Sequence, residues 1–255
     1  MNETNKGTLL VVGATGSIGR QVVAEGVREG WEVRALVRDE VRAGRLDSAA
    51  TRVVGDLTRP ETLSDALDGV DAVVFTQGAA YGDPTAAEFV DYGAVKNVLQ
   101  VLAGRPVRIA LMTAIGVTVR SNGHDWKRRG ERLVRASGND YTIVRPGWFD
   151  YNDADQLAIT LLQGDSRRAG SPADGVIARR QIARVLVGSL SSPSARNVTV
   201  ELVAEKGEEQ RDLDAVFATV EPDPSGSLDG VKDLPNMQPE AEPASVRNDL
   251  ERVQL

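Results

Sequence analysis

A doubly wound α/β fold with a mostly parallel sheet is predicted by two features of this 255-residue sequence. Short apolar runs alternate with segments of helical periodicity through about residue 145, an order that gives a parallel sheet with helices on both faces. The first apolar run leads directly into the glycine-rich turn GATGSIG, at residues 13–19, and then into a helix. A strand, a tight glycine turn and a helix form the unit with which this fold class begins.

The glycine-rich turn contains Gly13, Gly16 and Gly19, each with a predicted role. Gly13 can adopt a backbone conformation that a side chain would forbid, Gly16 lets the backbone approach a diphosphate, and Gly19 lets the helix pack closely on the strand. The free N–H groups near Ser17 and Ile18, at the start of the helix, then face an anion. The sequence therefore predicts a dinucleotide diphosphate at this turn, and a turn without a ligand is the alternative.

The end of the second predicted strand, residues 31–37, indicates which dinucleotide binds. An acidic side chain there holds the ribose 2′-hydroxyl of NAD, whereas an arginine accommodates the 2′-phosphate of NADP. Arg38 stands at this position and Arg42 follows one helical turn later, and a guanidinium can form two parallel hydrogen bonds with a phosphate. These residues favour NADP over NAD. The alternatives are that Asp39 turns inward instead, or that Arg38 is a solvated loop charge.

Four further strands are predicted at residues 51–54, 70–75, 107–112 and 141–144, with helices at 60–67 and 84–102. Asp56, after the third strand, could accept the adenine amino group, or could be a turn residue or helix cap. Gly78, after the fourth strand, would let the backbone pass close to the cofactor ribose, and Gln77 beside it is also expected to bind the cofactor. The loops after all six strands open at one edge of the sheet, where ligands bind. Six residues should therefore converge there: Gly13, Arg38, Asp56, Gly78, Thr113 and Gly147.

Two helical patterns are interpreted as structural. Tyr92 and Lys96 have the spacing that a reductase uses for its tyrosine acid and helper lysine, and they share one helix face. They lie between the fourth and fifth strands, one element too early for that motif, so packing and a solvated charge are preferred. The helix at residues 125–136 has a basic side, which we interpret as a solvated face.

The chain after the sixth strand should complete the same domain. Helices are expected at residues 153–162, 179–190 and 208–220, and a strand at 197–203. We expect residues 1–220 to form one dinucleotide-binding domain, with a small substrate-side cap from about residues 148–205. Residues 221–255 are acidic and proline-rich, and we expect a wrapping tail with a short helix at 245–253, not a second domain.

Composition limits the classes of function. The chain has no cysteine, which excludes disulfides and thiolate metal sites, and His124 is its one histidine, which argues against a histidine-based metal site. The net charge of −7 argues against nonspecific nucleic-acid binding. The polar N-terminus and the lack of a long apolar run predict no signal peptide and no membrane span. We expect a cytoplasmic monomer or homodimer that binds a small-molecule substrate, with no metal, nucleic-acid or membrane partner.

Five segments together resemble the short-chain dehydrogenase/reductase superfamily, specifically its atypical, NmrA-like branch of NAD(P)-binding proteins. They are GATGSIG at 13–19, VRALVRD at 33–39, GDL at 55–57, DYGAVKNVL at 91–99 and YTIVRPG at 141–147, and the resemblance covers roughly residues 8–190. It implies a Rossmann fold and the following ligands. Gly13, Thr15, Gly16, Ser17 and Ile18 would hold the diphosphate, Arg38 the 2′-phosphate, Asp56 and Leu57 the adenine, and Pro146, Gly147 and Trp148 the nicotinamide.

The catalytic positions depart from the pattern of this superfamily. Active members have a serine or threonine after strand five, and a tyrosine and a lysine four residues apart on the next helix. Lys127 aligns with that lysine and would hold the nicotinamide ribose, and Thr113 (or Ala114) takes the hydroxyl position. Gly123 stands where the tyrosine is expected. His124 is adjacent and could donate a proton at neutral pH, or be a plain loop residue.

Two functions follow from these observations. The first is an NADP-dependent oxidoreductase that passes hydride from NADPH to a small acceptor such as a quinone, a flavin or a carbonyl compound. The cofactor then does the chemistry, and the protein positions it and excludes water. The second is a catalytically weak NAD(P)-binding regulator that senses redox state. A nucleotide-sugar-type epimerase is a more distant alternative.

Overall fold

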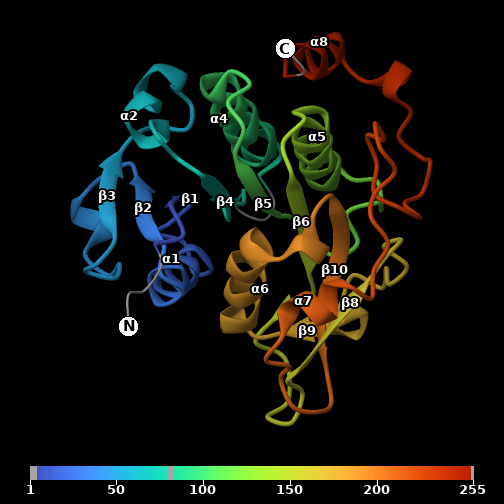
Figure 1. Ribbon diagram of the computed structural model, residues 1–255. Helices are drawn as coiled ribbons and strands as arrows, with labels where there is room; N and C mark the ends of the chain where they lie inside the picture. Colours follow the sequence, from blue (N-terminus) through green and yellow to red (C-terminus); the bar gives the residue numbers. More distant parts are fainter. Residues whose placement is uncertain (1–4, 80–82, 254–255) are drawn as a thin grey trace.

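An eight-stranded sheet forms the centre of the molecule in the computed structural model, which describes residues 5–79 and 83–253. Its strands lie in the order β3-β2-β1-β4-β5-β6-β10-β8 (Figure 1). Every neighbouring pair is parallel except β10 and β8. The strands are β1 (Thr8–Val12), β2 (Glu32–Val37), β3 (Thr51–Val54), β4 (Ala72–Phe75), β5 (Arg108–Met112), β6 (Tyr141–Pro146), β8 (Ala158–Leu162) and β10 (Val198–Glu205). The predicted doubly wound α/β fold is confirmed.

The central strand β1 is covered on both faces. All five of its residues are buried, and successive side chains point to opposite faces of the sheet. Leu9 and Val11 pack in one hydrophobic cluster with helices α1 and α6, whereas Leu10 and Val12 pack in another with α4 and α5. These helices are α1 (Gly19–Arg28), α6 (Arg179–Ser191), α4 (Ala94–Leu102) and α5 (Asn122–Ala136). An unbroken apolar run is what a parallel strand buried on both faces requires.

The strand order reverses between β1 and β4. From β1 the sheet continues through β2 and β3 on one side, and through β4, β5 and β6 on the other. At such a switch point the loops at the carboxyl ends of the strands diverge and leave a crevice for a ligand. The loops after β1 and β4 therefore form the floor of the place where a ligand is expected.

The helices between β3 and β5 are less regular than predicted. The segment at residues 60–67 consists of a 3₁₀ turn, Pro60–Thr62, and a short helix, α2 (Ser64–Leu67). The segment at residues 84–102 consists of α3 (Pro84–Ala86), a π-helical turn (Ala87–Gly93) and α4. Such π-helical turns are rare and are often found at functional sites.

Two of the later helices were predicted wrongly. Residues 153–162 contain no helix: they form a loop followed by β8, which pairs antiparallel with β10 at the edge of the sheet. The run AITLL, at residues 158–162, is short and partly β-branched. Because it can also pair with β10, it forms a strand and not a helix. The helix expected at residues 208–220 shrinks to α7 (Leu213–Phe217), because Asp212 caps it through the N–H groups of Asp214 and Ala215. A small second sheet of β7 (Trp148–Phe149) and β9 (Val176–Ile177) was not foreseen.

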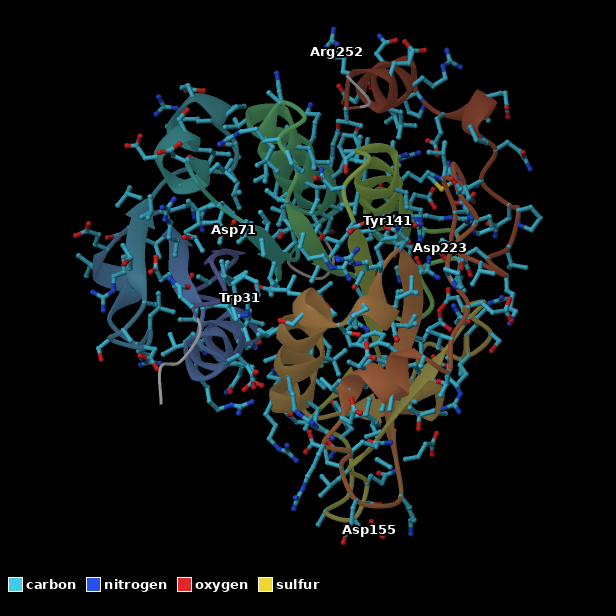
Figure 2. The ribbon with its side chains drawn as sticks, viewed as in Figure 1. Trp31, Asp71, Tyr141, Asp155, Asp223 and Arg252 are labelled. Atoms are coloured by element: carbon cyan, nitrogen blue, oxygen red, sulfur yellow. The ribbon has the colours of Figure 1, made fainter. Side chains whose placement is uncertain are left out.

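The tail at residues 221–255 packs on the domain. Figure 1 shows it passing along α5 before it ends in α8 (Ala244–Arg252). Val246 and Leu250 of α8 are buried in the hydrophobic cluster of α4 and α5. At the other end of the tail, Asp223 accepts a hydrogen bond of 3.0 Å from the hydroxyl of Tyr141, and Figure 2 shows the two residues together. The expected wrapping tail is present.

The basic side of α5 is not a solvated face, and that interpretation was wrong. Arg128 and Arg132 are only 1% and 0% exposed, respectively. Both guanidinium groups pair with Asp229 of the tail, at 3.0 and 2.9 Å, and Arg132 also pairs with Glu242 at 3.0 Å. Because a buried charge without a partner is very costly, these pairs fasten the tail to the helix.

Among the described residues, none of the helices combines the length and the apolar character needed to cross a membrane.

Candidate functional site

A cavity of about 520 Å³ opens at the carboxyl edge of the sheet, at the switch point between β1 and β4. Four loops, the π-helical turn and single residues of β2, β5, β7 and α4 contribute to its walls. The residues that line it are Gly13, Thr15, Gly16, Ser17, Ile18, Leu36, Arg38, Gly55, Asp56, Leu57, Thr58, Thr76, Gln77, Gly78, Phe89, Val90, Ala94, Met112 and Phe149. The structure therefore brings together most of the residues that the sequence assigned to a cofactor. Thr113, Lys127, Pro146, Gly147 and Trp148 are not among them.

The glycine-rich turn has the geometry that its sequence predicts. Gly13 has a φ of +80°, a conformation that side chains rarely adopt, and a Cβ there would lie 2.7 Å from the backbone nitrogen of Gln77. A Cβ at Gly19 would overlap the carbonyl oxygen of Gly13, so α1 can begin against the turn only with glycine at this position. The turn therefore carries the amino end of α1 to the edge of the cavity, where its partial positive charge favours an anion.

One end of the cavity lies between the loops after β2 and β3. The exposed Arg38 lines it, and Arg38 forms no hydrogen bond or ion pair with any residue that the structure describes. Asp39 does not turn inward, because its carboxylate accepts the N–H of Val41 at 2.8 Å. The side chain of Arg42 lies outside the part of the chain that is described. Arg38 thus presents a guanidinium without a hydrogen-bond partner among the described residues to this end of the cavity.

Asp56 occupies the neighbouring loop as a turn residue. Its Oδ1 accepts hydrogen bonds from the backbone N–H and the hydroxyl of Thr58, at 2.9 and 2.8 Å. These hydrogen bonds, with a smaller contribution from the charge of Arg38, hold the pKa of Asp56 below its usual value. The turn role that the sequence left open is therefore the one observed, and the carboxylate stays ionised at the cavity wall.

The other end of the cavity is apolar, with Met112, Phe89, Val90 and Phe149 in its wall. Gly147 is not among the lining residues. A Cβ there would overlap the carbonyl oxygen of Gly175, so the chain before β7 packs closely on the chain before β9. Trp148 is exposed and packs edge-on against Tyr151, with ring centroids 6.1 Å apart.

Thr113 follows Met112 but turns away from the cavity, which corrects its predicted convergence. Its hydroxyl donates to Oε1 of Glu131 at 2.7 Å, and both side chains are buried. Arg145 also binds Glu131, with Nη2 2.7 Å from Oε2. Burial opposes ionisation of Glu131, but the charge of Arg145 outweighs it and lowers the pKa of this carboxyl to about 2. The Thr113 proton is therefore held by a permanent carboxylate.

Lys127 lies one contact away from the cavity. Its Nζ is 2.6 Å from Oδ1 of Asp91, a buried carboxylate in the π-helical turn. The same oxygen accepts the N–H of Ala79, directly after Gly78 of the cavity wall, at 3.2 Å.

Gly123 lies in the first turn of α5, and a Cβ added to it would meet nothing within 4 Å. The Nδ1 atom of His124 is 2.8 Å from the carbonyl oxygen of Val119.

Tyr92 and Lys96 both face the tail. The Tyr92 hydroxyl donates to Oδ2 of Asp249 in α8 at 2.8 Å, and the Lys96 Nζ is 3.6 Å from the same atom. Burial, with the hydrogen bond to Asp249, raises the pKa of Tyr92 well above its usual value. A phenol held in this way anchors the tail and is a poor proton donor, in line with the packing interpretation.

Sequence reasoning missed one charged residue beside the glycine-rich turn. Arg179, the first residue of α6, donates from Nε to the Ser17 hydroxyl at 3.3 Å, and its guanidinium lies 5.3 Å from the ring centroid of Phe149. Ser17 and Phe149 both line the cavity. The only signal in the sequence was an arginine that begins a helix after the sixth strand, and that pattern alone does not locate it.

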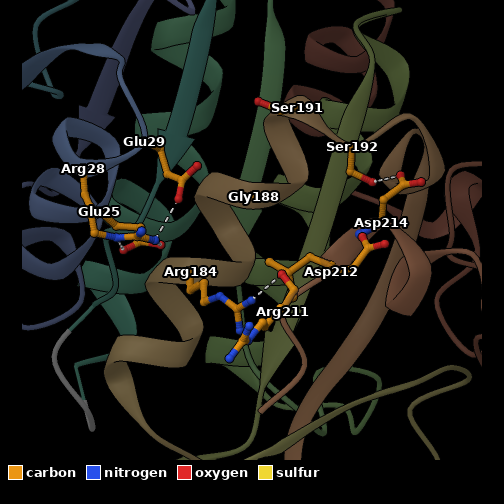
Figure 3. A pocket seen from close by; sticks show the side chains of 11 residues that line it. Glu25, Arg28, Glu29, Arg184, Gly188, Ser191, Ser192, Arg211, Asp212 and Asp214 are labelled. Carbon is orange, nitrogen blue, oxygen red and sulfur yellow. Dashed lines mark hydrogen bonds and ion pairs between the residues drawn. The ribbon is translucent and has the colours of Figure 1, made fainter. Parts of the chain in front are cut away.

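A second cavity, of about 390 Å³, lies between α1, α6 and the start of α7 (Figure 3). It is formed by the carboxyl-terminal part of α1, at the edge of the sheet opposite the glycine-rich turn. Its charges neutralise one another: Arg28 pairs with Glu25 and Glu29, and Arg184 pairs with Glu209. Most of the charges at this site are therefore already paired within the protein. The described residues contain no group of carboxylates and histidines that could hold a metal ion.

A family model described as NAD(P)H-binding matches residues 13–193, which include the glycine-rich turn and most of the cavity wall. The chain belongs to this NAD(P)H-binding family. A nicotinamide dinucleotide is thus the cofactor class of the family, and the predicted membership of an NAD(P)-binding family is confirmed.

Two curated relatives illustrate the range of this NAD(P)H-binding family. A photosystem II assembly factor, Ycf39, from Trieres chinensis is 28% identical over 210 residues, which are 78% of this chain and 65% of that protein. Sanguinarine reductase from Eschscholzia californica is 26% identical over 86% of this chain and 98% of that protein. The chain spans about half to two thirds of the length of the Ycf39 relatives that it matches.

Solved structures of other proteins share the fold. A protein described as an NAD-dependent epimerase/dehydratase from Bacillus halodurans superposes with a TM-score of 0.69 at 23% identity, over 84% of this chain and all of that one. A protein described as an NADH-flavin reductase from Streptococcus pneumoniae gives 0.61 at 21% identity, over 78% of this chain and all of that one. At these identities the likeness extends to the fold alone.

Proposed function

We propose that this protein is an NADPH-dependent oxidoreductase of the atypical short-chain dehydrogenase/reductase type, which passes hydride to a small acceptor. The observation that carries the proposal is the cavity at the switch point, with the unpaired Arg38 at one end and an apolar wall at the other. A guanidinium without a carboxylate partner suits a 2′-phosphate, so Arg38 supports NADP over NAD. Met112, Phe89 and Phe149 suit a flat, apolar ring system at the opposite end.

The residues of the cavity have complementary tasks in this proposal. Gly13, Thr15, Gly16, Ser17 and Ile18 bind the diphosphate, Asp56 and Leu57 orient the adenine, and Gln77 and Gly78 contact the ribose. Lys127 is proposed to reach the nicotinamide ribose, and Pro146, Gly147 and Trp148 to support the nicotinamide from behind the apolar wall. When bound, NADPH supplies the hydride.

The class of hydride acceptor can be inferred from which groups of the site could donate a proton to it. A tyrosine acid is missing at Gly123, and the Thr113 hydroxyl donates to Glu131. Reduction of an isolated carbonyl needs a proton at the developing alkoxide, which general acids supply. A quinone or flavin delocalises the negative charge that hydride transfer creates, so water can supply the proton later. We therefore propose a quinone or flavin as the acceptor, ahead of a simple carbonyl compound.

Steady-state oxidation of NADPH tests this proposal. Purified protein is mixed with NADPH and menadione, FMN or a simple aldehyde, and NADH is the matched cofactor. We expect loss of NADPH absorbance with menadione or FMN, much slower loss with NADH, and little with the aldehyde. Nucleotide binding without turnover of any acceptor would contradict an oxidoreductase. Turnover with NADH as fast as with NADPH would contradict the role of Arg38.

A redox-sensing regulator is the second candidate, and the missing tyrosine favours it. A sensor must bind NADP⁺ and NADPH with different affinities, because a ligand shifts an equilibrium only by its differential binding. Calorimetric titration of both forms measures this difference. Equal affinities would exclude the sensor. A strong preference, with no turnover in the acceptor screen, would replace the oxidoreductase proposal by this one.

The localisation, oligomeric state and partners of the protein are also part of what we propose. We propose a cytoplasmic monomer or homodimer that acts on a small molecule without a nucleic-acid partner. The net charge of −7 supports the last point, because phosphate backbones repel an acidic surface. Light scattering at several concentrations distinguishes monomer from dimer.

A further inference from the structure

Arg179 joins the carboxyl-terminal half of the chain to the glycine-rich turn. It follows β9 and begins α6, 162 residues after Ser17. Its Nε donates to the Ser17 hydroxyl over 3.3 Å, which is long for a hydrogen bond. Its guanidinium faces the ring of Phe149. The two partners come from different walls of the same cavity, so the positive charge stands between the glycine-rich turn and β7.

Asp150 sets the orientation of Arg179. Its Oδ1 accepts the backbone N–H of Arg179 at 2.9 Å, and its Oδ2 pairs with Nη1 of the same residue. Asp150 has a φ of +59°, an uncommon conformation for a residue with a side chain. The carboxylate therefore fixes both the start of α6 and the direction of the guanidinium.

The remaining edge of the guanidinium is open. Nη1 is bound by Asp150 and Nε makes the long contact with Ser17, whereas Nη2 forms no hydrogen bond within the described residues. Nε and Nη2 lie on one edge of the planar group. That edge is the fork that binds two oxygens of one phosphate in parallel.

We propose that Arg179 is a ligand of the cofactor diphosphate, supplied by the second half of the chain. The inference rests on the proposed nucleotide-binding role of the cavity and adds to it a ligand from outside the glycine-rich turn. A diphosphate on the N–H groups of the turn would lie beside the Ser17 hydroxyl, within reach of the Nε–Nη2 edge. The negatively charged diphosphate would then accept the hydrogen bond that Nε now donates to Ser17, while Asp150 continues to bind Nη1.

This role makes a prediction that differs from that for Arg38. The diphosphate is common to NAD and NADP, so loss of Arg179 weakens both. The 2′-phosphate belongs to NADP alone, so loss of Arg38 weakens only NADP. ADP-ribose carries the diphosphate without the 2′-phosphate, and adenosine 2′-monophosphate carries the 2′-phosphate without the diphosphate. These two fragments separate the two arginines.

Calorimetric titration of the full-length chain with both fragments and both dinucleotides is the test. Arg179→Ala should weaken ADP-ribose, NAD⁺ and NADP⁺ by about tenfold, the range for a hydrogen-bonded charge, and leave adenosine 2′-monophosphate unchanged. Arg180→Ala is the matched control, because Arg180 is the next residue of α6 and pairs with Glu209 on the surface. Arg180→Ala should bind all four ligands as the wild type does.

A second variant distinguishes the loss of a phosphate ligand from a loss of stability. Arg179→Lys keeps a positive charge for Asp150 but cannot present two parallel donors. It should unfold at the wild-type temperature and still bind ADP-ribose more weakly. Unchanged ADP-ribose affinity in both Arg179 variants would overturn this inference and leave the proposed nucleotide site standing. Failure of the wild type to bind any of the four ligands would overturn both.

Discussion

The Thr113 hydroxyl and the Glu131 carboxylate are joined by a buried hydrogen bond of 2.7 Å. Arg145 binds both oxygens of Glu131, and its other side forms a bidentate pair with Asp233 of the tail, at 2.7 Å for each contact. The residue at the catalytic hydroxyl position is thus the end of a buried charge network that runs from the end of β5 to the tail.

Thr113→Val removes the donor and leaves the carboxylate in place. We expect the free energy of unfolding to fall by about 1–3 kcal/mol, the usual cost of an unsatisfied buried group. The rate with a quinone should stay near the wild-type value, because the hydroxyl does not face the cavity. Urea unfolding and steady-state kinetics measure the two effects, and Thr113→Ser, which keeps the hydroxyl, is the control. A large loss of rate with unchanged stability would return Thr113 to a catalytic role.

Arg38→Ala tests the cofactor preference. The variant should bind NADP⁺ about tenfold or more weakly, because it loses hydrogen bonds between charged groups. NAD⁺ should bind as before. Arg52→Ala, on the exposed strand β3, removes the same charge away from the cavity and should change neither affinity. Equal losses for both dinucleotides would show that Arg38 acts through the general charge of the site.

Lys127→Met separates the two possible tasks of Lys127. It leaves the buried Asp91 carboxylate without its cation, so stability should fall by roughly 2 kcal/mol. Adding Asp91→Asn removes the orphaned charge and should restore most of that stability. If Lys127 also holds the nicotinamide ribose, the double variant recovers stability but keeps a raised KM for NADPH. Recovery of both would assign Lys127 to the ion pair alone.

Gly123→Tyr places a phenol at the position of the missing acid. The site is open, and glycine is a weak helix former, so the variant should be as stable as the wild type or slightly more so, by about 0.5 kcal/mol. We expect it to reduce simple aldehydes with NADPH faster than the wild type, without a comparable gain for quinones. Gly123→Phe, which lacks the hydroxyl, is the control. An equal gain in both variants would point to packing, and no gain in Gly123→Tyr would show that Lys127 is not positioned to assist a tyrosine.

Glu201→Gln should stabilise the protein in a pH-dependent way. Burial, followed by the nearby Asp165 and Asp233, raises the pKa of Glu201 to about 8 against the opposing charge of Arg145. Stability from its protonated form is fully present below the usual value of 4.5 and is lost as the pH rises through about 8. The glutamine variant should therefore match the wild type near pH 4.5 and exceed it by up to about 5 kcal/mol above pH 8. Urea unfolding across this range would contradict the assignment if the difference were constant with pH.

The first half of the fold was predictable because its signals are local. Most strands from β1 to β6 contain an apolar run, and the glycine-rich turn specifies its own geometry through Gly13 and Gly19. The residues placed at the cavity wall from this half, such as Arg38 and Asp56, follow from the rule that loops meet at the carboxyl edge.

The later elements depend on partners that are distant in sequence. The run Ala158–Leu162 becomes a strand because β10 pairs with it, and its own pattern does not distinguish helix from strand. Arg132 is buried because Asp229 lies 97 residues further on, and Arg179 reaches the cavity because Ser17 lies 162 residues before it. Periodicity carries no information about such pairs.

The fastening of the tail has a consequence for how the chain acquires its structure during synthesis. Arg128 and Arg132 leave the ribosome roughly 100–110 residues before the carboxylates with which they pair, Asp229 and Glu242. Until those carboxylates arrive, the interior beside α5 holds guanidinium groups that must stay hydrated. The nascent domain can therefore close its interior beside α5 only after the tail has been synthesised, and the tail completes this face of the fold.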